Sequence, residues 1–131
     1  MPEQTEQNIE IAKRGYDAFS SGDMETVMSL IDDDIDWVQP GESAISGTYH
    51  GKGELSELLR RMAEKGTTVR PLRFFADGDT VVVLSEGTVG GETAREVDVL
   101  TIRDGKTVRA EACTDTALME RVYGKKQVAT G

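Results

Sequence analysis

The second half of the chain contains four β-strand patterns in succession, separated by turn sequences of only two or three residues. The strand patterns cover residues 69–76, 81–89, 94–103 and 107–116. The turns between them are Asp77-Gly78-Asp79, Gly90-Gly91 and Asp104-Gly105. Turns this short join antiparallel neighbours, because a parallel crossover needs a dozen or more residues. We therefore predict a four-stranded antiparallel meander.

The first half of the chain shows helical periodicity instead. A helix is predicted over residues 5–20, with Thr5 as its N-cap and Gly22 as its break. Asp23 is the predicted cap of a second helix over 24–31, and a third helix is predicted over 54–65. Residues 35–39 read as a strand and residues 43–51 as a Gly/Ser-rich loop.

Helices that come first and strands that come later indicate an α+β fold, not alternating βαβ units. A length of 131 residues suits one domain, which we assign to residues 1–131. One face of the meander needs covering, and three helices are available. If the sheet bends around the long first helix, the fold is a cone-shaped curved antiparallel sheet wrapped around three helices, with a cavity at the mouth of the cone.

The net charge and the cysteine content argue against several classes of partner and cofactor. The formal net charge is −9, so phosphate backbones and anionic membranes would be repelled. We expect no nucleic acid and no membrane partner, and a cytoplasmic location. Cys113 is the one cysteine and His50 the one histidine, so we predict no disulfide, no metal site and no cofactor.

Alternation along the last two strands selects candidate site residues. Glu96, Asp98, Leu100 and Ile102 share one side of their strand, and the two apolar members suggest that Asp98 points inward. Glu111, Cys113 and Asp115 share one side of the last strand. A carboxyl group buried without a partner holds its proton, and it can then act as a general acid or donate a hydrogen bond to a developing enolate.

The same residues could also have purely structural roles. Asp115 could instead cap a short terminal helix that contains Leu118 and Met119. Asp98 could pair with a buried arginine or tyrosine without taking part in catalysis. Tyr16 and Trp37 are expected to form the pocket wall or the core, because aromatic side chains mostly serve burial.

Four sequence motifs, in order, resemble one superfamily. They are Gly15-Tyr16-Asp17-Ala18-Phe19-Ser20-Ser21-Gly22-Asp23, Asp36-Trp37-Val38-Gln39-Pro40-Gly41, Gly47-Thr48-Tyr49-His50-Gly51, and Ile102-Arg103-Asp104-Gly105-Lys106 with Asp115-Thr116. The chain resembles the SnoaL-like polyketide cyclases and ketosteroid isomerase of the nuclear transport factor two-like superfamily. The resemblance implies a cystatin-like α+β roll, an apolar pocket and a homodimer formed through the outer sheet face.

The resemblance also implies roles for individual residues. The general acid/base of SnoaL-like cyclases stands where Asp115 does, and the oxyanion-hole acid of ketosteroid isomerase stands where Asp98 does. The general base of that isomerase aligns with Gln39, which cannot take a proton, and its catalytic tyrosine aligns near Gly15. The epoxide hydrolases of the superfamily match less well, through Asp98, Asp115 and either Arg73 or Arg95, because Arg95 lies an odd number of residues from Asp98.

The function predicted from the sequence is the binding of a small apolar ligand, cyclic or polycyclic, with cofactor-free isomerase or cyclase chemistry. Asp115 and Asp98 are the predicted catalytic residues. The predicted wall residues are Tyr16, Trp37, Tyr49, Glu86 and Cys113. The alternatives are a non-catalytic ligand-binding module and a protein-interaction module of the same fold.

Overall fold

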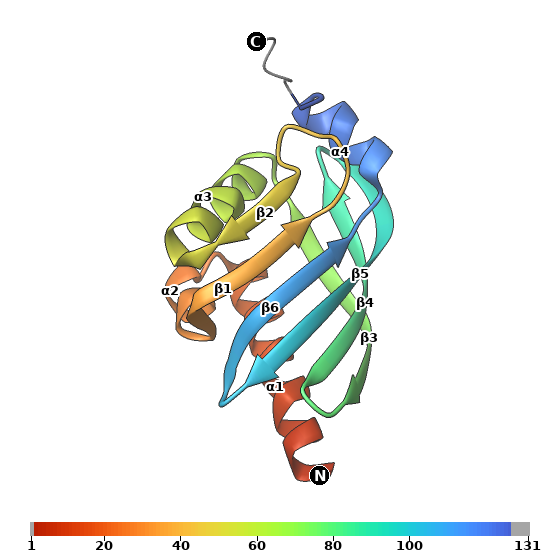
Figure 1. Cartoon of the computed structure of the whole chain (residues 1–131). Coiled ribbons are helices and arrows are strands. Elements are labelled where there is room, and N and C mark those ends of the chain that lie inside the picture. The colour runs from red at the N-terminus through yellow and green to blue at the C-terminus, as the bar shows by residue number, and fades with distance from the viewer. Residues whose placement is uncertain (1, 127–131) are drawn as a thin grey trace.

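The computed structural model describes residues 2–126. Its helices are α1 (Pro2–Ser21), α2 (Met24–Ser29), α3 (Gly51–Glu64) and α4 (Thr116–Tyr123). Its strands are β1 (Ile31–Gln39), β2 (Gly47–His50), β3 (Thr68–Asp77), β4 (Thr80–Val89), β5 (Glu92–Arg103) and β6 (Lys106–Cys113). Figure 1 shows a curved sheet with α1 and α2 behind it, α3 beside β2, and α4 at the opposite end from the start of α1.

The predicted meander is present. The sheet has the order β2-β1-β6-β5-β4-β3, and every neighbouring pair from β3 to β6 is antiparallel. The prediction of an antiparallel sheet fails at one place, because β1 runs parallel to β6. These two strands are far apart in the sequence, so the intervening elements supply the long connection that parallel neighbours need.

The edge beside β1 differs from the sequence-based expectation. Residues 47–50, predicted as loop, form β2, which pairs with β1 so that Tyr49 lies opposite Trp37. Strand β1 begins at Ile31 and includes the acidic run 32–34, with an irregular register between Ile31 and Asp36. The sheet edge and this irregularity allow charged side chains to reach water.

The helix ends follow the predicted capping in part. Helix α1 begins at Pro2, so Thr5 lies inside the helix and is not its N-cap. The predicted break at Gly22 is confirmed by its φ of +78°, a conformation that suits glycine. The Asp23 side chain accepts a hydrogen bond from the Thr26 N–H at 3.1 Å, which confirms Asp23 as the cap of α2.

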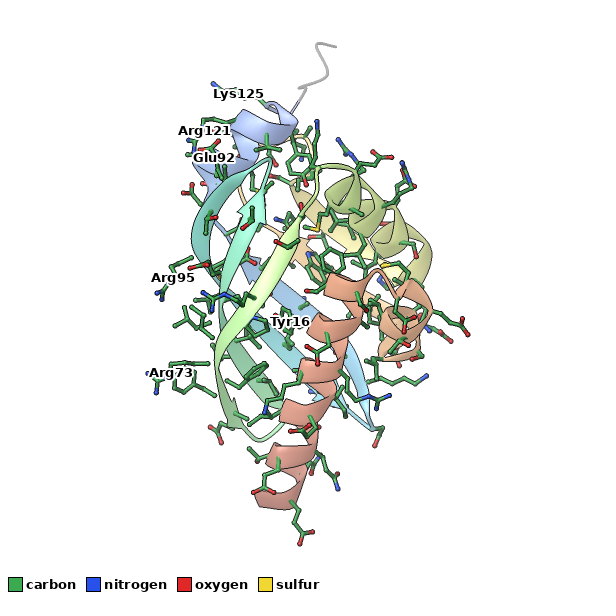
Figure 2. The ribbon with its side chains drawn as sticks, turned by 180° about the vertical axis from the view of Figure 1, so that it is seen from behind. Tyr16, Arg73, Glu92, Arg95, Arg121 and Lys125 are labelled. Atoms are coloured by element: carbon green, nitrogen blue, oxygen red, sulfur yellow. The ribbon has the colours of Figure 1, made fainter. Side chains whose placement is uncertain are left out.

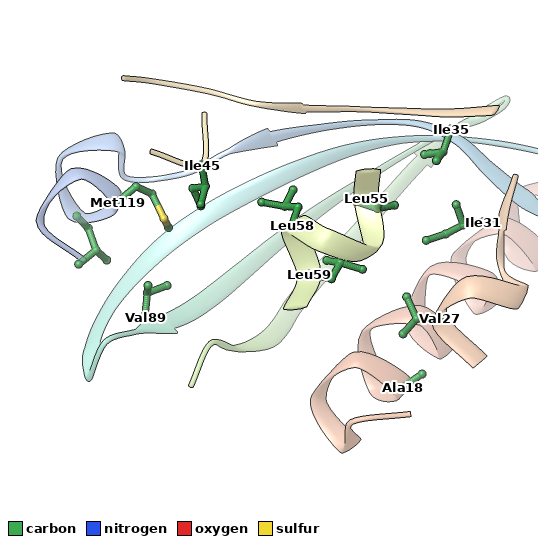
Figure 3. Packing of buried hydrophobic residues seen from close by; sticks show 11 residues of the cluster. Ala18, Val27, Ile31, Ile35, Ile45, Leu55, Leu58, Leu59, Val89 and Met119 are labelled. Carbon is green, nitrogen blue, oxygen red and sulfur yellow. The ribbon is translucent and has the colours of Figure 1, made fainter. Parts of the chain in front are cut away.

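The core lies between the concave face of the sheet and the helices. Leu55, Leu58 and Leu59 of α3 are buried in the cluster that Figure 3 shows, together with Val27, Ile35 and Met119. A second cluster joins Ala12 of α1 to β4, β5 and β6. The small Ala12 side chain lets α1 approach the sheet closely, so the next turn of α1 faces β5. Among the described residues, no helix is long and apolar enough to cross a bilayer.

Candidate active site

A partly open cavity of about 130 Å³ lies between the concave face of the sheet and the helices. Most of its wall is apolar, with side chains such as Ile11, Phe19, Leu59, Met62, Val69 and Met119. A cavity of roughly 150 Å³ in another protein holds one benzene molecule. The volume therefore suits about one ring of a ligand, and the rest of a larger ligand would extend through the opening.

Asp98 lies on this wall and is tied to helix α1. The residue is 7% exposed, and its Oδ2 accepts a hydrogen bond from the Tyr16 hydroxyl at 2.5 Å. Figure 2 shows Tyr16 on the side of α1 that faces the sheet. Burial raises the pKa of Asp98 to about 6, and the hydrogen bond from Tyr16 opposes that rise. The Tyr16 pKa is raised well above its usual value, first by burial and then by the Asp98 charge.

Glu96 lies two residues before Asp98, on the same face of β5, and also lines the cavity. Among the described residues, its carboxyl group has no hydrogen-bond or ion-pair partner. Burial, followed by the nearby Asp98 charge, raises its pKa to about 7. At neutral pH Glu96 therefore exchanges readily between its protonated and ionised forms, which is the property of an efficient general acid or base.

A glycine on the neighbouring strand makes room for this carboxyl group. A Cβ atom at Gly87 would lie 3.0 Å from Glu96 Oε1 and 3.1 Å from its carboxyl carbon. Any side chain at position 87 would push the Glu96 carboxyl group aside. Glycine at position 87 of β4 thus leaves space for the Glu96 carboxyl group on the cavity wall.

Two further polar groups lie on the cavity wall. The Trp37 Nε1–H donates to Gln39 Oε1 at 3.1 Å, while Gln39 Nε2 is buried and has no partner among the described residues. Thr114 Oγ1 is buried and equally without a partner in that part of the chain. Leaving a buried polar group unpaired costs about 1–3 kcal/mol, so a water or a ligand that paired with either group would stabilise the protein.

Three of the predicted site residues line the cavity, namely Tyr16, Trp37 and Asp98. The predicted position of Asp115 in the cavity is wrong. Asp115 is exposed, and its Oδ1 accepts a hydrogen bond from the Leu118 N–H at 3.0 Å as the N-cap of α4. Cys113 is exposed as well. The reason is that Ala110 and Ala112 take the buried face of β6, so Glu111 and Cys113 face outward.

The other predicted wall residues also lie outside the cavity. Glu86 shares the outward face of β4 with Val82 and Leu84, and it pairs with Arg70 at 3.1 Å. The Tyr49 hydroxyl donates to the Ile45 carbonyl oxygen at 2.6 Å, and its ring packs on the core.

The match to the epoxide hydrolases requires an arginine in the cavity, and neither candidate arginine lies there. Arg73 and Arg95 are both exposed, neither lines the cavity, and Figure 2 shows them pointing away from α1. Among the described residues, no group of three His, Cys, Asp or Glu side chains is arranged to hold a metal ion. The polar chemistry of the cavity is therefore that of carboxyl, hydroxyl and amide groups.

Sequence reasoning placed Glu96 on the face of Asp98 but did not select it as a site residue. The signal was its spacing of two residues from Asp98, combined with Ser85 and Gly87, which put small residues on the same side of β4. Gln39 was considered only as a group unable to act as a base. Thr114 carried no recognisable signal, because it follows the last residue of β6.

The fold and site define a class, namely small cone-shaped α+β proteins with an apolar cavity that carries carboxyl groups on its wall. The SnoaL-like domain family matches residues 12–110. This chain belongs to the SnoaL-like domain family and has the cystatin-like, NTF2-like fold. The comparison with curated proteins gives no match.

Solved structures resemble the chain over nearly its whole length. Bal32a, from a soil-derived mobile gene cassette, is 27% identical with a TM-score of 0.84, covering 91% of this chain and 98% of its own. A protein of unknown function with a cystatin-like fold from Xanthomonas campestris is 31% identical with a TM-score of 0.81, covering 90% and 98%. TerC, co-crystallised with polyporic acid, is 31% identical with a TM-score of 0.78, covering 89% and 98%.

Proposed function

We propose that the protein binds a small apolar organic molecule in its cavity and catalyses cofactor-free proton transfer on it, as an isomerase or cyclase does. The observation that carries this proposal is the Glu96 carboxyl group, which lines an apolar cavity, has no partner in the described part of the chain and lies beside an Asp98 that accepts a hydrogen bond from Tyr16.

In the proposed step, ionised Glu96 takes a proton from a carbon atom next to a carbonyl group of the ligand. The C–H bond breaks, its electron pair forms the enolate, and Glu96 becomes neutral. Return of that proton to the same carbon, or to a conjugated one, regenerates Glu96 and gives the ketone or its isomer. No electron acceptor and no cofactor is consumed.

Asp98 and Tyr16 have a supporting role in this step. The Asp98 charge raises the pKa of Glu96, which makes ionised Glu96 a stronger base. The Tyr16 hydrogen bond favours the ionised form of Asp98. Asp98 is therefore proposed to act through Glu96, whereas the proposal does not use Asp115, which already serves as the cap of α4.

A non-catalytic binding module is the second candidate. A buried arginine paired with the acids would favour it, but the partner of Asp98 is the tyrosine hydroxyl. TerC was co-crystallised with polyporic acid, so polyporic acid is the first ligand to test for binding. Trp37, the one tryptophan of the chain, lines the cavity, and quenching of its fluorescence would report the binding.

Hydrogen exchange tests catalysis. We expect the protein to accelerate deuterium incorporation at the carbons next to the carbonyl of 2-indanone in D₂O, followed by proton NMR. Glu96→Gln should lower this rate on the order of 100-fold or more. Glu86→Gln, on the outward face of β4, is the matched control and should leave it unchanged. No acceleration by the wild-type protein, or an equal loss in both variants, would refute the catalytic proposal.

A homodimer formed through the outer sheet face, in the cytoplasm, is part of the same proposal. Val82 and Leu84 of β4 lie opposite Val99 and Val97 of β5, and all four are only half-buried. Phe75 of the neighbouring β3 is 48% exposed. A second copy of the chain would cover this apolar area.

A further inference from the structure

The orientation of the Gln39 amide is fixed by its neighbour on the same strand. The indole Nε1–H of Trp37 can only donate, so the atom that it meets at 3.1 Å is the Gln39 carbonyl oxygen. The amide nitrogen, which carries two N–H donors, is therefore the end left without a partner among the described residues. Gln39 is 2% exposed, its amide nitrogen is buried, and the residue lines the cavity.

The sheet register places Gln39 in a row with Asp98. Val38 of β1 pairs with Glu111 of β6, and continuing by one residue sets Gln39 beside Ala112. Ala112 in turn pairs with Asp98 of β5. Neighbouring strands are about 4.8 Å apart, so the Gln39 and Asp98 backbones are separated by about 10 Å.

The next row of the sheet holds the other polar groups. Val97 pairs with Cys113, the last residue of β6, and Glu96 and Thr114 are the next residues of the two segments beyond this pair. Strand β6 lies between the carboxyl groups of β5 and Gln39 of β1. Its residue at this place is the small Ala112, which also lines the cavity. A methyl group at that place leaves space for a ring between the acids and the amide.

We infer that Gln39 Nε2 and Thr114 Oγ1 form an oxygen-binding subsite that holds the carbonyl oxygen of the ligand, which makes a cyclic ketone the substrate class. The amide N–H and the hydroxyl O–H donate to this oxygen, while the ring lies over Ala112 and its edge reaches Glu96 and Asp98. This inference rests on the proposed function, because the same donors would stabilise the enolate that Glu96 generates.

The test compares two ligands of the same shape. 2-Indanone carries a carbonyl oxygen and indane does not, and ligand-observed NMR titration gives the dissociation constant of each. We expect the wild-type protein to bind 2-indanone about tenfold more tightly than indane, because indane leaves both buried donors unpaired. Gln39→Met and Thr114→Val keep the side-chain size and remove the donors, and each should reduce this preference to about threefold or less.

The preference is the ratio of the two dissociation constants, for indane and for 2-indanone. A variant that only loosens the cavity weakens the binding of both ligands and leaves this ratio unchanged.

The binding ratio also separates this inference from the proposed function. A lost preference in Gln39→Met and Thr114→Val supports the subsite even if 2-indanone undergoes no exchange. A preference that both variants keep, but that Tyr16→Phe or Glu96→Gln removes, would place the oxygen on the acidic side and overturn the subsite. Failure of the wild-type protein to bind either compound would overturn both proposals.

Discussion

The Tyr16 hydroxyl donates to Asp98 Oδ2 at 2.5 Å, and this bond links α1 to β5 across 82 residues of sequence. Ser20, further along α1, makes another polar contact with the sheet, because its Oγ donates to the Val69 carbonyl oxygen at 3.1 Å, whereas Ala12 packs on the sheet through apolar contacts. Tyr16 also packs edge-on against Phe74, with ring centroids 6.4 Å apart. The position of Asp98 therefore depends on how α1 packs.

Replacing Tyr16 by phenylalanine should raise the pKa of Asp98 above about 6, because the hydrogen bond that favours its ionised form is lost. Stability should fall by about 2 kcal/mol near pH 8, where Asp98 is ionised, and by less at pH 5. Carbon-detected NMR titration of the aspartate carboxyl groups and urea unfolding measure the two effects. Tyr123→Phe, on another part of the cavity wall, is the control and should leave the Asp98 titration unchanged.

Replacing Glu96 by glutamine should stabilise the protein at high pH. The folded-state pKa of Glu96, about 7, lies above its unfolded value of 4.5, so neutral Glu96 contributes stability that is full below pH 4.5 and is lost as the pH rises through about 7. Glutamine stays neutral, so the variant should exceed the wild type by on the order of 2–3 kcal/mol at pH 8, with little difference near pH 4.5.

Urea unfolding of both proteins between pH 5 and pH 8 measures this difference. Glu86 is on the outward face of β4 and pairs with Arg70, so Glu86→Gln should not reproduce the pH-dependent gain. A Glu96→Gln protein that is less stable than the wild type at pH 8 would show that the carboxylate is paired in solution.

Gly87→Ala tests whether the position of Glu96 matters for proton transfer. The added Cβ atom would lie 3.0 Å from Glu96 Oε1, so the carboxyl group must move by a few tenths of an ångström. We expect a fall of about tenfold in the exchange rate of 2-indanone, with stability changed by less than about 1 kcal/mol. Gly53→Ala in α3, where the new atom meets nothing within 4 Å, should leave exchange unchanged.

The sequence predicted the architecture better than the site. Short turns, helical periodicity and caps are local, so the meander, the Asp23 cap and the presence of α3 could be predicted from the sequence. Alternation places Cys113 and Asp115 on the same face of the last strand but does not say which face is buried. The small apolar residues Ala110 and Ala112 alternate with the charged Arg109 and Glu111, and this pattern indicates that the alanine face is the buried one. Gln39 Nε2 and Thr114 Oγ1 have no partner among the described residues, and only three-dimensional contacts reveal that.

Substitutions of Asp115 distinguish its structural role from the catalytic role predicted for it. As the N-cap of α4 it accepts a hydrogen bond from the Leu118 N–H. Asp115→Ala should therefore cost about 1 kcal/mol in urea unfolding, whereas Asp115→Asn should cost little, because asparagine caps equally well. Neither change should alter 2-indanone exchange. A folded Asp115→Asn protein without exchange activity would return Asp115 to the proton-transfer role and require a rearrangement of α4.

The outer face of the sheet gives a prediction about assembly. Leu84 lies directly opposite Val97, and Val82 opposite Val99, so two cross-strand pairs form one continuous aliphatic surface on the side away from the cavity. If a second copy covers this surface, light scattering after size-exclusion chromatography will give about twice the chain mass of 14.3 kDa. Leu84→Asp would place a charge in the interface, where it has no partner, and should give monomers. Ala63→Asp, on an exposed position of α3, adds the same charge outside the surface and should stay dimeric. A wild-type protein that is monomeric at 100 µM, an experimental concentration on the order of typical interface affinities or above, would remove the homodimer and leave the surface for a different partner.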